Sequence, residues 1–290
     1  MHVNKGRLEI TTSIPDEASD SDIKNLKLFI KDFTELFNQL DDMLSLPGLF
    51  KKKAVLAKRL QKVVTLWEQG SEDSIVEYCS LAMFARDLRE LADYEPQRFK
   101  EIRQKLRSQK RSSSWQGLKF EVHLAAALIR TIQAGVTIRE SPDFQINIAD
   151  DCAYIEATSV HLNGKTRANS HFYKVDSKIT EKLKKSYANK STALAIDITN
   201  IMYHEDLRGE GLETELEAFI GELGVRGDID FGAIILVTFY SDFERGSHHM
   251  GHKVVPLPEC NPALAEALSI AFPVSPEPHI VFDPVLPEIS

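Results

Sequence analysis

The stretch from Asp143 to Val160 decides the fold. It opens with Asp143-Phe-Gln-Ile-Asn-Ile148 and closes with Tyr154-Ile-Glu-Ala-Thr-Ser-Val160, and apolar and polar residues alternate in both segments. Alternation with a period of two is typical of half-buried β-strands. Asp150 and Asp151, between the segments, favour a tight turn. The stretch therefore predicts a β-hairpin.

The hairpin also predicts which acidic side chains share a face of the sheet. If the turn centres on Asp150 and Asp151, Asp143 faces Thr158 across the hairpin. Glu156 then lies diagonally from Asp143 on the same face, because side chains alternate along each strand. Two carboxylates at that separation can hold one hard cation through their oxygens. A loop one residue longer would put the two carboxylates on opposite faces of the sheet. The alternative to a cation site is two acids that face solvent on an exposed strand.

A helix is predicted before the hairpin, from residue 116 to residue 133. Its apolar residues recur at three- and four-residue spacing, and Lys119, His123 and Arg130 form the opposite face. Glu121 falls inside the apolar stripe, where an ionised group is costly unless something pairs with it. A divalent cation is one such partner, and a core arginine or a neighbouring loop is the alternative.

A second helix and a buried strand are predicted after the hairpin. Residues 162–175 are polar and predict a loop, and the helix is expected to begin at Asp176-Ser177, which are good N-cap residues. Lys182 borders the apolar ridge of this helix, and Lys178 lies one turn earlier. The nearly continuous apolar run 192–199 predicts a buried strand. The predicted order is thus helix, strand, strand, helix, strand.

Over roughly residues 115 to 200 this arrangement resembles the PD-(D/E)XK nuclease superfamily, which has the restriction-endonuclease-like fold. Glu121 matches the acid of the first core helix, Pro142-Asp143 matches the "PD", and Glu156-Ala157-Thr158 matches the "(D/E)XK". The chain departs from the motif at Thr158, where the family usually carries a lysine.

In some members of that family the lysine function comes from the following helix. The resemblance then assigns this function to Lys182, with Lys178 as second choice.

The resemblance implies an α/β (α+β) fold in which helices flank a mixed β-sheet, and metal-dependent hydrolysis of phosphodiester bonds. Asp143 and Glu156 would hold Mg²⁺ or Mn²⁺, and Glu121 would complete the metal site directly or through water. With Lys182 these form the expected catalytic set. We expect nucleic acid as the substrate, with DNA ahead of RNA. The alternative is a nuclease fold that does not cleave and binds nucleic acid or a protein partner, for which Thr158 is the main argument.

Composition bounds the remaining possibilities. The chain has 290 residues, 43% of them hydrophobic, which suffices for one large core or two modest ones. No apolar run approaches the roughly eighteen residues of a membrane span, and no apolar segment follows Met1. We therefore expect a cytoplasmic protein that has no membrane partner. Cys79, Cys152 and Cys260 are scattered and odd in number, which predicts reduced thiols.

The net charge of −8 at pH 7 is unevenly distributed. Residues 98–111 contain seven Lys or Arg and one acid, and residues 162–190 contain eight Lys or Arg and two acids. Basic stretches on either side of the proposed site are what phosphate contacts need. A solvated helix face and a loop are the alternative.

Two domains are predicted, residues 1–111 and residues 112–290. Helical apolar spacing from Ile23 to Leu46, with three further helices before residue 109, predicts that the first domain is all-helical. Its aromatic stripe (Phe29, Phe33 and Phe37) suits a core or a partner surface, so a homodimer or a protein partner through these helices is one possibility. Residues 111–115 are expected to form the linker.

Further secondary structure is predicted towards the C-terminus. An acidic helix is expected at residues 214–223, and the apolar run 232–240 should add a strand to the sheet. His248, His249 and His252 lie in a glycine-flanked segment that predicts a loop, so a surface histidine cluster is favoured over a metal site. Two apolar patches in the proline-rich tail that begins at Pro256 are expected to cover an edge strand.

Overall fold

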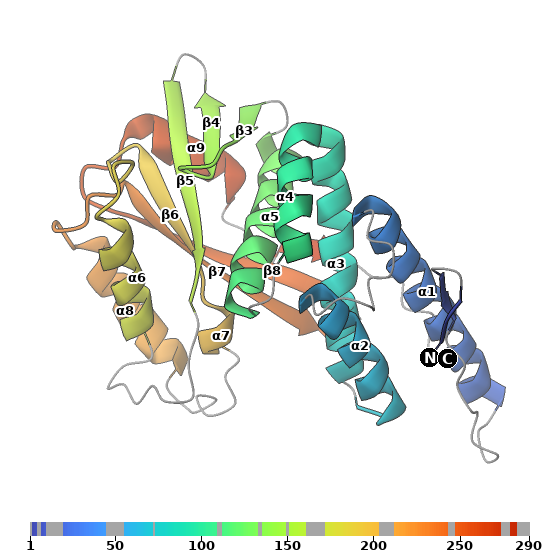
Figure 1. The fold of residues 1–290 in the computed structure, drawn as a ribbon. Coiled ribbons are helices and arrows are strands. Elements are labelled where there is room, and N and C mark those ends of the chain that lie inside the picture. The colour runs from blue at the N-terminus through green and yellow to red at the C-terminus, as the bar shows by residue number, and fades with distance from the viewer. Residues whose placement is uncertain are drawn as a thin grey trace. The chain divides into compact units, whose positions relative to one another are not determined.

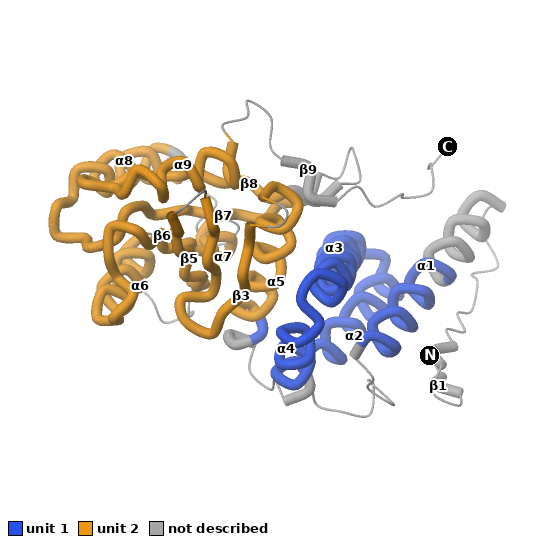
Figure 2. Tube along the Cα trace, turned by 90° about the horizontal axis from the view of Figure 1, so that it is seen from above, with its two compact units in different colours: residues 1–115, 241–248, 282–290 blue, residues 116–240, 249–281 orange. Residues whose placement is uncertain are grey.

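The computed structural model describes most of the chain and divides it into two compact units (Figure 2). The first comprises residues 1–115, 241–248 and 282–290, and the second comprises residues 116–240 and 249–281. The described residues are 2–4, 7–9, 20–44, 55–71, 73–108, 112–132, 135–148, 151–160, 172–202, 212–242, 247–273 and 279–282.

The first unit is mainly helical. A small antiparallel sheet of β1 (His2–Asn4) and β2 (Arg7–Glu9) precedes its helices, so the expectation of an all-helical domain misses these two strands. The helices in its described residues are α1 (Asp20–Leu44), α2 (Val55–Glu68), α3 (Asp73–Tyr94) and α4 (Pro96–Ser108).

The apolar spacing of these helices becomes their buried face. In α1, Phe33 and Phe37 are buried and belong to the core, whereas the side chain of Phe29 lies outside the described residues. Helix α2 ends at Glu68, and Gly70 in the turn that follows has a φ of 68°, which lies in the left-handed region. The N–H of Ser71 donates to the carbonyl of Leu66 at 2.9 Å. Glycine adopts this conformation without a steric penalty, so the helix ends there.

The predicted linker at residues 111–115 ends where the first unit ends, at Trp115, but residues 112–115 are helical and do not form a loop. Ser112 begins α5 (Ser112–Ile132), and Trp115 is buried within its first turns. The indole ring of Trp115 packs edge-on against Phe84, with ring centroids 4.8 Å apart. The serine run resembled a loop, but burial of the adjacent aromatic ring stabilises the helix against that local tendency.

The second unit is built on a mixed β-sheet (Figure 1). The described strands lie in the order β3-β4-β5-β6-β7-β8-β9. Strands β3, β4 and β5 pair antiparallel, whereas β5, β6 and β7 pair parallel. These strands span Val136–Ile138 (β3), Phe144–Ile148 (β4), Asp151–Ser159 (β5), Thr192–Asp197 (β6), Ala233–Asp242 (β7), Ser247–Pro256 (β8) and His279–Phe282 (β9). The protein is therefore α+β with a mixed sheet and an N-terminal helical part.

Helices connect the parallel strands and cover the sheet. Helix α6 (Tyr173–Lys182) lies between β5 and β6 in the sequence, and α7 (Thr199–Met202) and α8 (Leu212–Gly224) lie between β6 and β7. Figure 1 shows α6 and α8 side by side against the sheet. Their apolar residues join one buried cluster with β6 and β7, which includes Ile179, Leu223, Leu194 and Ile234. This packing explains why β6 is buried throughout, because helices cover a parallel strand on both faces.

Helix α5 packs on the opposite face of the sheet. Phe239 of β7 contacts Phe120 and His123 of α5, with ring centroids 6.3 and 5.1 Å apart. His123 is fully buried, so its predicted place on a polar face is wrong. The predicted apolar stripe is too narrow, because α5 also buries Phe120, Val122 and His123.

Two predicted features near the C-terminus also change. The histidine segment lies in strand β8, not in a loop: Leu257, just after β8, donates its N–H to the carbonyl of Gly232, just before β7, at 2.9 Å. Gly251 allows close packing in this strand, since a Cβ there would lie 3.2 Å from the Thr238 side chain. Helix α9 (Pro262–Ala271) was not predicted; Asn261 caps it by accepting from the N–H of Ala263 at 2.8 Å.

Candidate functional site

The hairpin of β4 and β5 brings Asp143 and Glu156 together. Phe144 pairs with Ile155, so Asp143, one residue before β4, is in register with Glu156. The predicted register is shifted by two residues, because Asp151 pairs with Ile148 and so belongs to β5 instead of the turn centre. A shift of two keeps the face of every side chain. The two acids are therefore directly opposite each other, not diagonal.

Asp143 is held in place by the backbone of the neighbouring strand. Its Oδ2 accepts a hydrogen bond from the N–H of Ala157 at 2.8 Å. Burial, followed by the negative charges of Glu156 and Glu121, raises the pKa of Asp143 to about 7, and the Ala157 N–H and the Lys182 ammonium oppose this rise. Asp143 therefore sits within electrostatic reach of both other predicted acids.

Glu156 is a buried carboxylate that binds a lysine. The residue is 6% exposed, and Oε1 accepts from Nζ of Lys182 at 2.5 Å. The second oxygen, Oε2, is buried and has no hydrogen-bond partner among the described residues. A buried charged oxygen without a donor is costly, so it marks a position where a ligand would be stabilising.

Lys182 reaches Glu156 because α6 crosses the face of the sheet on which Glu156 lies. Ile179, one turn earlier, is buried under the helix, and Lys182 is its last residue. Helix α6 begins at Tyr173, not near Asp176-Ser177 as predicted. Burial of Phe172 and Val175 extends the helix past the favourable N-cap residues, because tertiary packing overrides local propensity.

In the described part of this segment, neither Lys178 nor Lys184 forms an ion pair with the two carboxylates. Lys178, the second choice, pairs with Glu181 at 2.7 Å on the surface, and Lys184 is exposed. Thr158 lies two positions after Glu156 on β5, so it faces the same side of the sheet. A lysine at that position and the lysine of α6 would thus approach Glu156 from the same side.

Glu121 completes the electrostatic cluster from α5. Its side chain is partly exposed, and its charge acts on Asp143. Within the described ranges, no three His, Cys, Asp or Glu side chains form a group ready to bind a metal ion. The structure thus brings Asp143 and Glu156 together with Lys182, and places Glu121 near Asp143 without a three-carboxylate ligand set.

The donor set still fits a magnesium or manganese ion. Mg²⁺ prefers oxygen ligands and keeps several waters, so one or two carboxylates are enough. Asp143 and Glu156 supply carboxylate oxygens in register, and the partnerless Oε2 of Glu156 is the kind of atom such an ion would bind.

Tyr187 is a residue of this site that the sequence indicated only as core. Burial, followed by interaction with the Glu156 carboxylate, raises the pKa of its phenol, so the hydroxyl remains protonated near the acids. In the sequence Tyr187 continues the apolar spacing of Ile179 and Leu183, although α6 ends at Lys182. Its ring does pack against the cluster beneath α6 and α8. The sequence could have indicated this role, because a tyrosine at the end of an apolar ridge can place its hydroxyl beyond the core.

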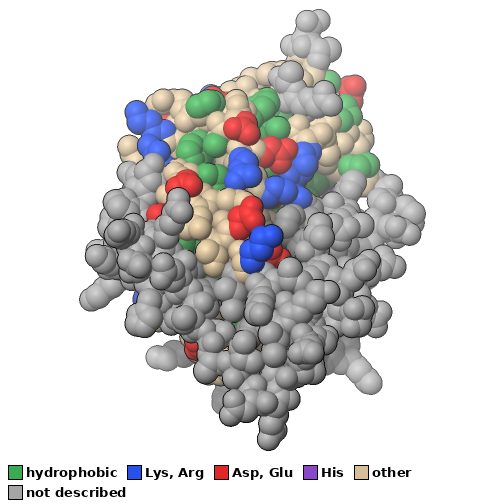
Figure 3. All heavy atoms as spheres, turned by 90° about the vertical axis from the view of Figure 1, so that its right-hand side faces the viewer, with side chains coloured by type: hydrophobic (Ala, Val, Ile, Leu, Met, Phe, Trp, Pro, Cys, Tyr) green, Lys and Arg blue, Asp and Glu red, His purple; other side chains and the backbone are tan. Residues whose placement is uncertain are grey.

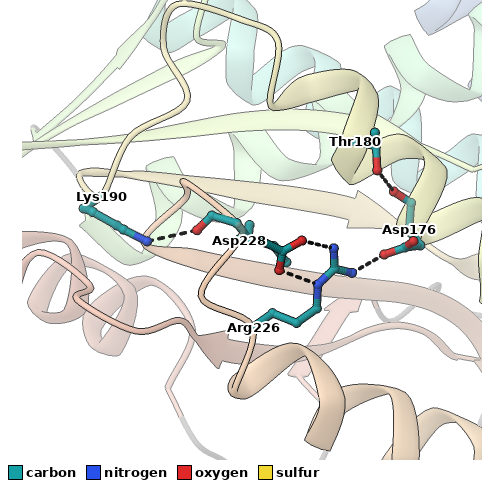
Figure 4. A network of polar contacts seen from close by, with 6 residues as sticks. Asp176, Thr180, Lys190, Arg226 and Asp228 are labelled. Carbon is teal, nitrogen blue, oxygen red and sulfur yellow. Dashed lines mark hydrogen bonds and ion pairs between the residues drawn. The ribbon is translucent and has the colours of Figure 1, made fainter.

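A network of charged groups fixes the start of α6 to the segment after α8 (Figure 4). Arg226 donates to Asp228 from Nε at 3.0 Å and from Nη2 at 2.8 Å, and it also binds Asp176. Lys190 donates from Nζ to the carbonyl of Ile229 at 2.9 Å. A cavity of about 230 Å³ beside this network is lined by Phe172, Tyr173, Asp176, Phe219, Glu222, Leu223 and Arg226. The network was not predicted; it holds the helix that presents Lys182.

Fewer side chains of the two basic stretches are available for phosphate contacts than the sequence implied. In residues 98–111, Arg98 is 5% exposed and pairs with Glu101 at 2.6 Å, while Lys100 and Lys105 are exposed. In the described part of residues 162–190, Lys178 pairs with Glu181, Lys182 pairs with Glu156 and Lys190 donates to the carbonyl of Ile229, while residues 162–171 lie outside the described residues. In Figure 3 positive and negative side chains lie next to each other on the coloured surface. On this face, charge alone thus does not mark a nucleic-acid surface.

The predicted histidine cluster is spread along β8. The side chains of His248 and His249 lie outside the described residues, and the ring of His252 packs against Phe272 with centroids 5.2 Å apart. The three cysteines have free thiols.

Comparison with protein-family models, curated proteins and solved structures finds no match for this chain. Across the described helices, none combines the length and apolar character that crossing a membrane requires.

Proposed function

We propose that the protein is a metal-dependent nuclease of the PD-(D/E)XK type, in which Lys182 of α6 replaces the lysine that the motif would carry at Thr158. One observation carries the proposal: Asp143 and Glu156 are in register on one face of the sheet, and the Lys182 ammonium lies 2.5 Å from Glu156. The order α5, β3-β4-β5, α6, β6 supports the same conclusion, because it contains the elements on which the resemblance rests.

Each residue has a distinct role in this proposal. Asp143 and Glu156 would hold Mg²⁺ or Mn²⁺, and Glu121 would contribute directly or through water. When bound, the ion would polarise the scissile phosphate and lower the pKa of a coordinated water. Lys182 carries a movable positive charge that can stabilise charge developing on the phosphate or orient the attacking water.

The substrate class follows from the chemistry of the site. A lysine beside carboxylates that bind a hard cation suits a phosphodiester, and the exposed Lys184 and Lys185 follow Lys182 in the sequence. Nucleic acid is the substrate we propose, with DNA as the first candidate.

The test is cleavage by the full chain. Supercoiled plasmid, single-stranded DNA and RNA are incubated with the protein in Mg²⁺, Mn²⁺ or EDTA. We expect cleavage in metal that Glu156→Gln abolishes, while Glu181→Gln, a surface carboxylate of α6, cleaves at the wild-type rate. If wild type cuts none of these substrates, or if Glu156→Gln cuts equally fast, the nuclease proposal is wrong.

The second candidate is a nuclease-fold module that binds nucleic acid or a protein without cleaving. Thr158 favours it, because the motif position itself carries no cation. The ion pair between Lys182 and Glu156 also favours it, since this ammonium neutralises the site without a metal. Retention of a labelled oligonucleotide in a gel-shift assay without cleavage in any metal is the expected result for this module.

A further inference from the structure

The ion pair between Lys182 and Glu156 has the geometry of an internal counter-ion. Nζ lies 2.5 Å from Oε1, and the two side chains are 16% and 8% exposed. Water and salt screen such a buried pair only weakly, so each charge depends strongly on the other. The same ammonium also interacts electrostatically with Asp143. Lys182 thus supplies to both carboxylates the positive charge that a metal ion would otherwise provide.

The ammonium is able to leave this position. Lys182 is the last residue of α6, and its charge is carried on a flexible four-carbon stem. The helix itself is fixed by Ile179 in the core and by the Arg226 network at its start. The stem can therefore swing while the helix stays in place.

We propose that Lys182 is a displaceable cation that competes with the metal ion for Glu156 and so sets the metal affinity of the site. The inference rests on the metal-dependent function proposed above. In the metal-free protein the ammonium balances Glu156 and preserves the packing of α6 on β5. Its release, once a divalent cation neutralises the carboxylates, makes it available to a phosphate oxygen. The site would then present a free lysine only when it is loaded.

Calorimetric titration with Mn²⁺ tests the competition on the full chain. Lys182→Met removes the charge and keeps the apolar stem, so it should bind Mn²⁺ at least about tenfold more tightly than wild type. Lys182→Arg keeps the charge and can bind the carboxylate with two parallel hydrogen bonds, so it should bind Mn²⁺ no more tightly than wild type. Lys178→Met is the matched control, because it removes a lysine of the same helix that pairs with Glu181, not Glu156.

A second measurement uses wild type alone and does not depend on the folding of Lys182→Met. NMR of the ¹⁵N-labelled lysine ammonium groups should show a slowly exchanging signal in the metal-free protein. This signal should be absent from Lys182→Arg and should be lost from wild type at saturating Mg²⁺.

The outcomes separate the two proposals. Equal Mn²⁺ affinity in wild type, Lys182→Met and Lys178→Met, or an ammonium signal that persists at saturating Mg²⁺, overturns the competition and leaves the metal site standing. Tighter binding by Lys182→Met alone supports the competition, even if wild type binds too weakly to measure. No Mn²⁺ binding by any variant overturns the metal-dependent function and this inference together.

Discussion

The carboxylate of Asp143 is tied to the backbone N–H of Ala157, the residue that follows Glu156, by a hydrogen bond of 2.8 Å. This bond locks the end of one strand onto its neighbour and keeps two acids close together away from water. The pKa of Asp143 then depends on the charge of Glu156 and, to a smaller extent, on that of Lys182, which makes this carboxyl sensitive to pH.

Ionisation of Asp143 should lower the stability of the metal-free protein as the pH rises from about 4 to 7. The folded state raises the pKa of Asp143 from 3.8 to about 7, so it binds more protons than the unfolded chain in that window. Asp143→Asn cannot ionise and retains an acceptor for the Ala157 N–H. The free energy of unfolding of Asp143→Asn should exceed that of wild type by on the order of 2 kcal/mol at pH 8, with little difference at pH 4. Urea unfolding in EDTA at both pH values measures this, and parallel pH profiles would contradict the assignment.

Divalent metal should stabilise wild type. An ion that binds the folded state at a hundredfold excess over its Kd adds about 2.7 kcal/mol. Thermal unfolding with millimolar Mg²⁺ or Mn²⁺, compared with EDTA, should show a higher Tm for wild type and a much smaller rise for Asp143→Asn. An equal rise in both proteins would mean that Asp143 is not a ligand.

Lys182→Ala should abolish most metal-dependent cleavage. Loss of a charge that stabilises the transition state costs about a hundredfold or more in rate, whereas loss of one phosphate contact changes binding little. Lys184→Ala, on an exposed position, is the control and should cleave normally. Circular dichroism checks that both variants fold. Wild-type rates for a folded Lys182→Ala would show that the lysine assignment is wrong.

Gly232→Ala should destabilise the protein by about 2 to 4 kcal/mol. A Cβ at Gly232 would lie 2.2 Å from the carbonyl oxygen of Lys190 and 2.5 Å from Leu264, and the backbone oxygen cannot move aside. Gly221→Ala in α8 is the matched control, since a Cβ there meets nothing within 4 Å. Alanine should stabilise that helix by about 0.5 to 1 kcal/mol. Equal effects of the two substitutions in urea unfolding would contradict the packing described.

Arg226→Gln should lower stability by about 1 kcal/mol, because the pairs of Arg226 with Asp176 and Asp228 are partly exposed to solvent. Urea unfolding in low salt and in 1 M NaCl measures the effect, which salt should reduce. A loss that is the same at both salt concentrations would assign it to packing of the arginine stem.

The hairpin was predictable from the sequence because its information is local. Alternation of apolar residues fixed which face each acid occupies, and this survived a register shift of two residues. The register itself depends on which residues form the turn, and two adjacent aspartates do not distinguish the choices. Two apolar runs of strand length likewise indicated that β6 and β7 belong to the sheet, whereas their parallel pairing was not predicted.

Features that depend on contacts distant in the sequence could not be predicted. His123 appeared polar-facing, yet Phe239, from a strand far along the chain, packs against its ring. The start of α6 depends on burial of Phe172, and the Arg226 network joins residues 50 positions apart. Lys182 was singled out by its place beside an apolar ridge, but its contact with Glu156 required the strand order of the sheet.

Parallel pairing of β5 with β6 forces the chain to cross back over the sheet, and α6 is that crossover. A lysine ammonium can therefore reach the same carboxylate from two places in the sequence: the strand that carries the carboxylate, or the crossover helix that packs on that strand. A reciprocal exchange, Thr158→Lys with Lys182→Thr, would move the cation between these places without altering the topology. What such a site requires is therefore an ammonium group at one position in space. The residue that supplies it can belong to either the strand or the helix.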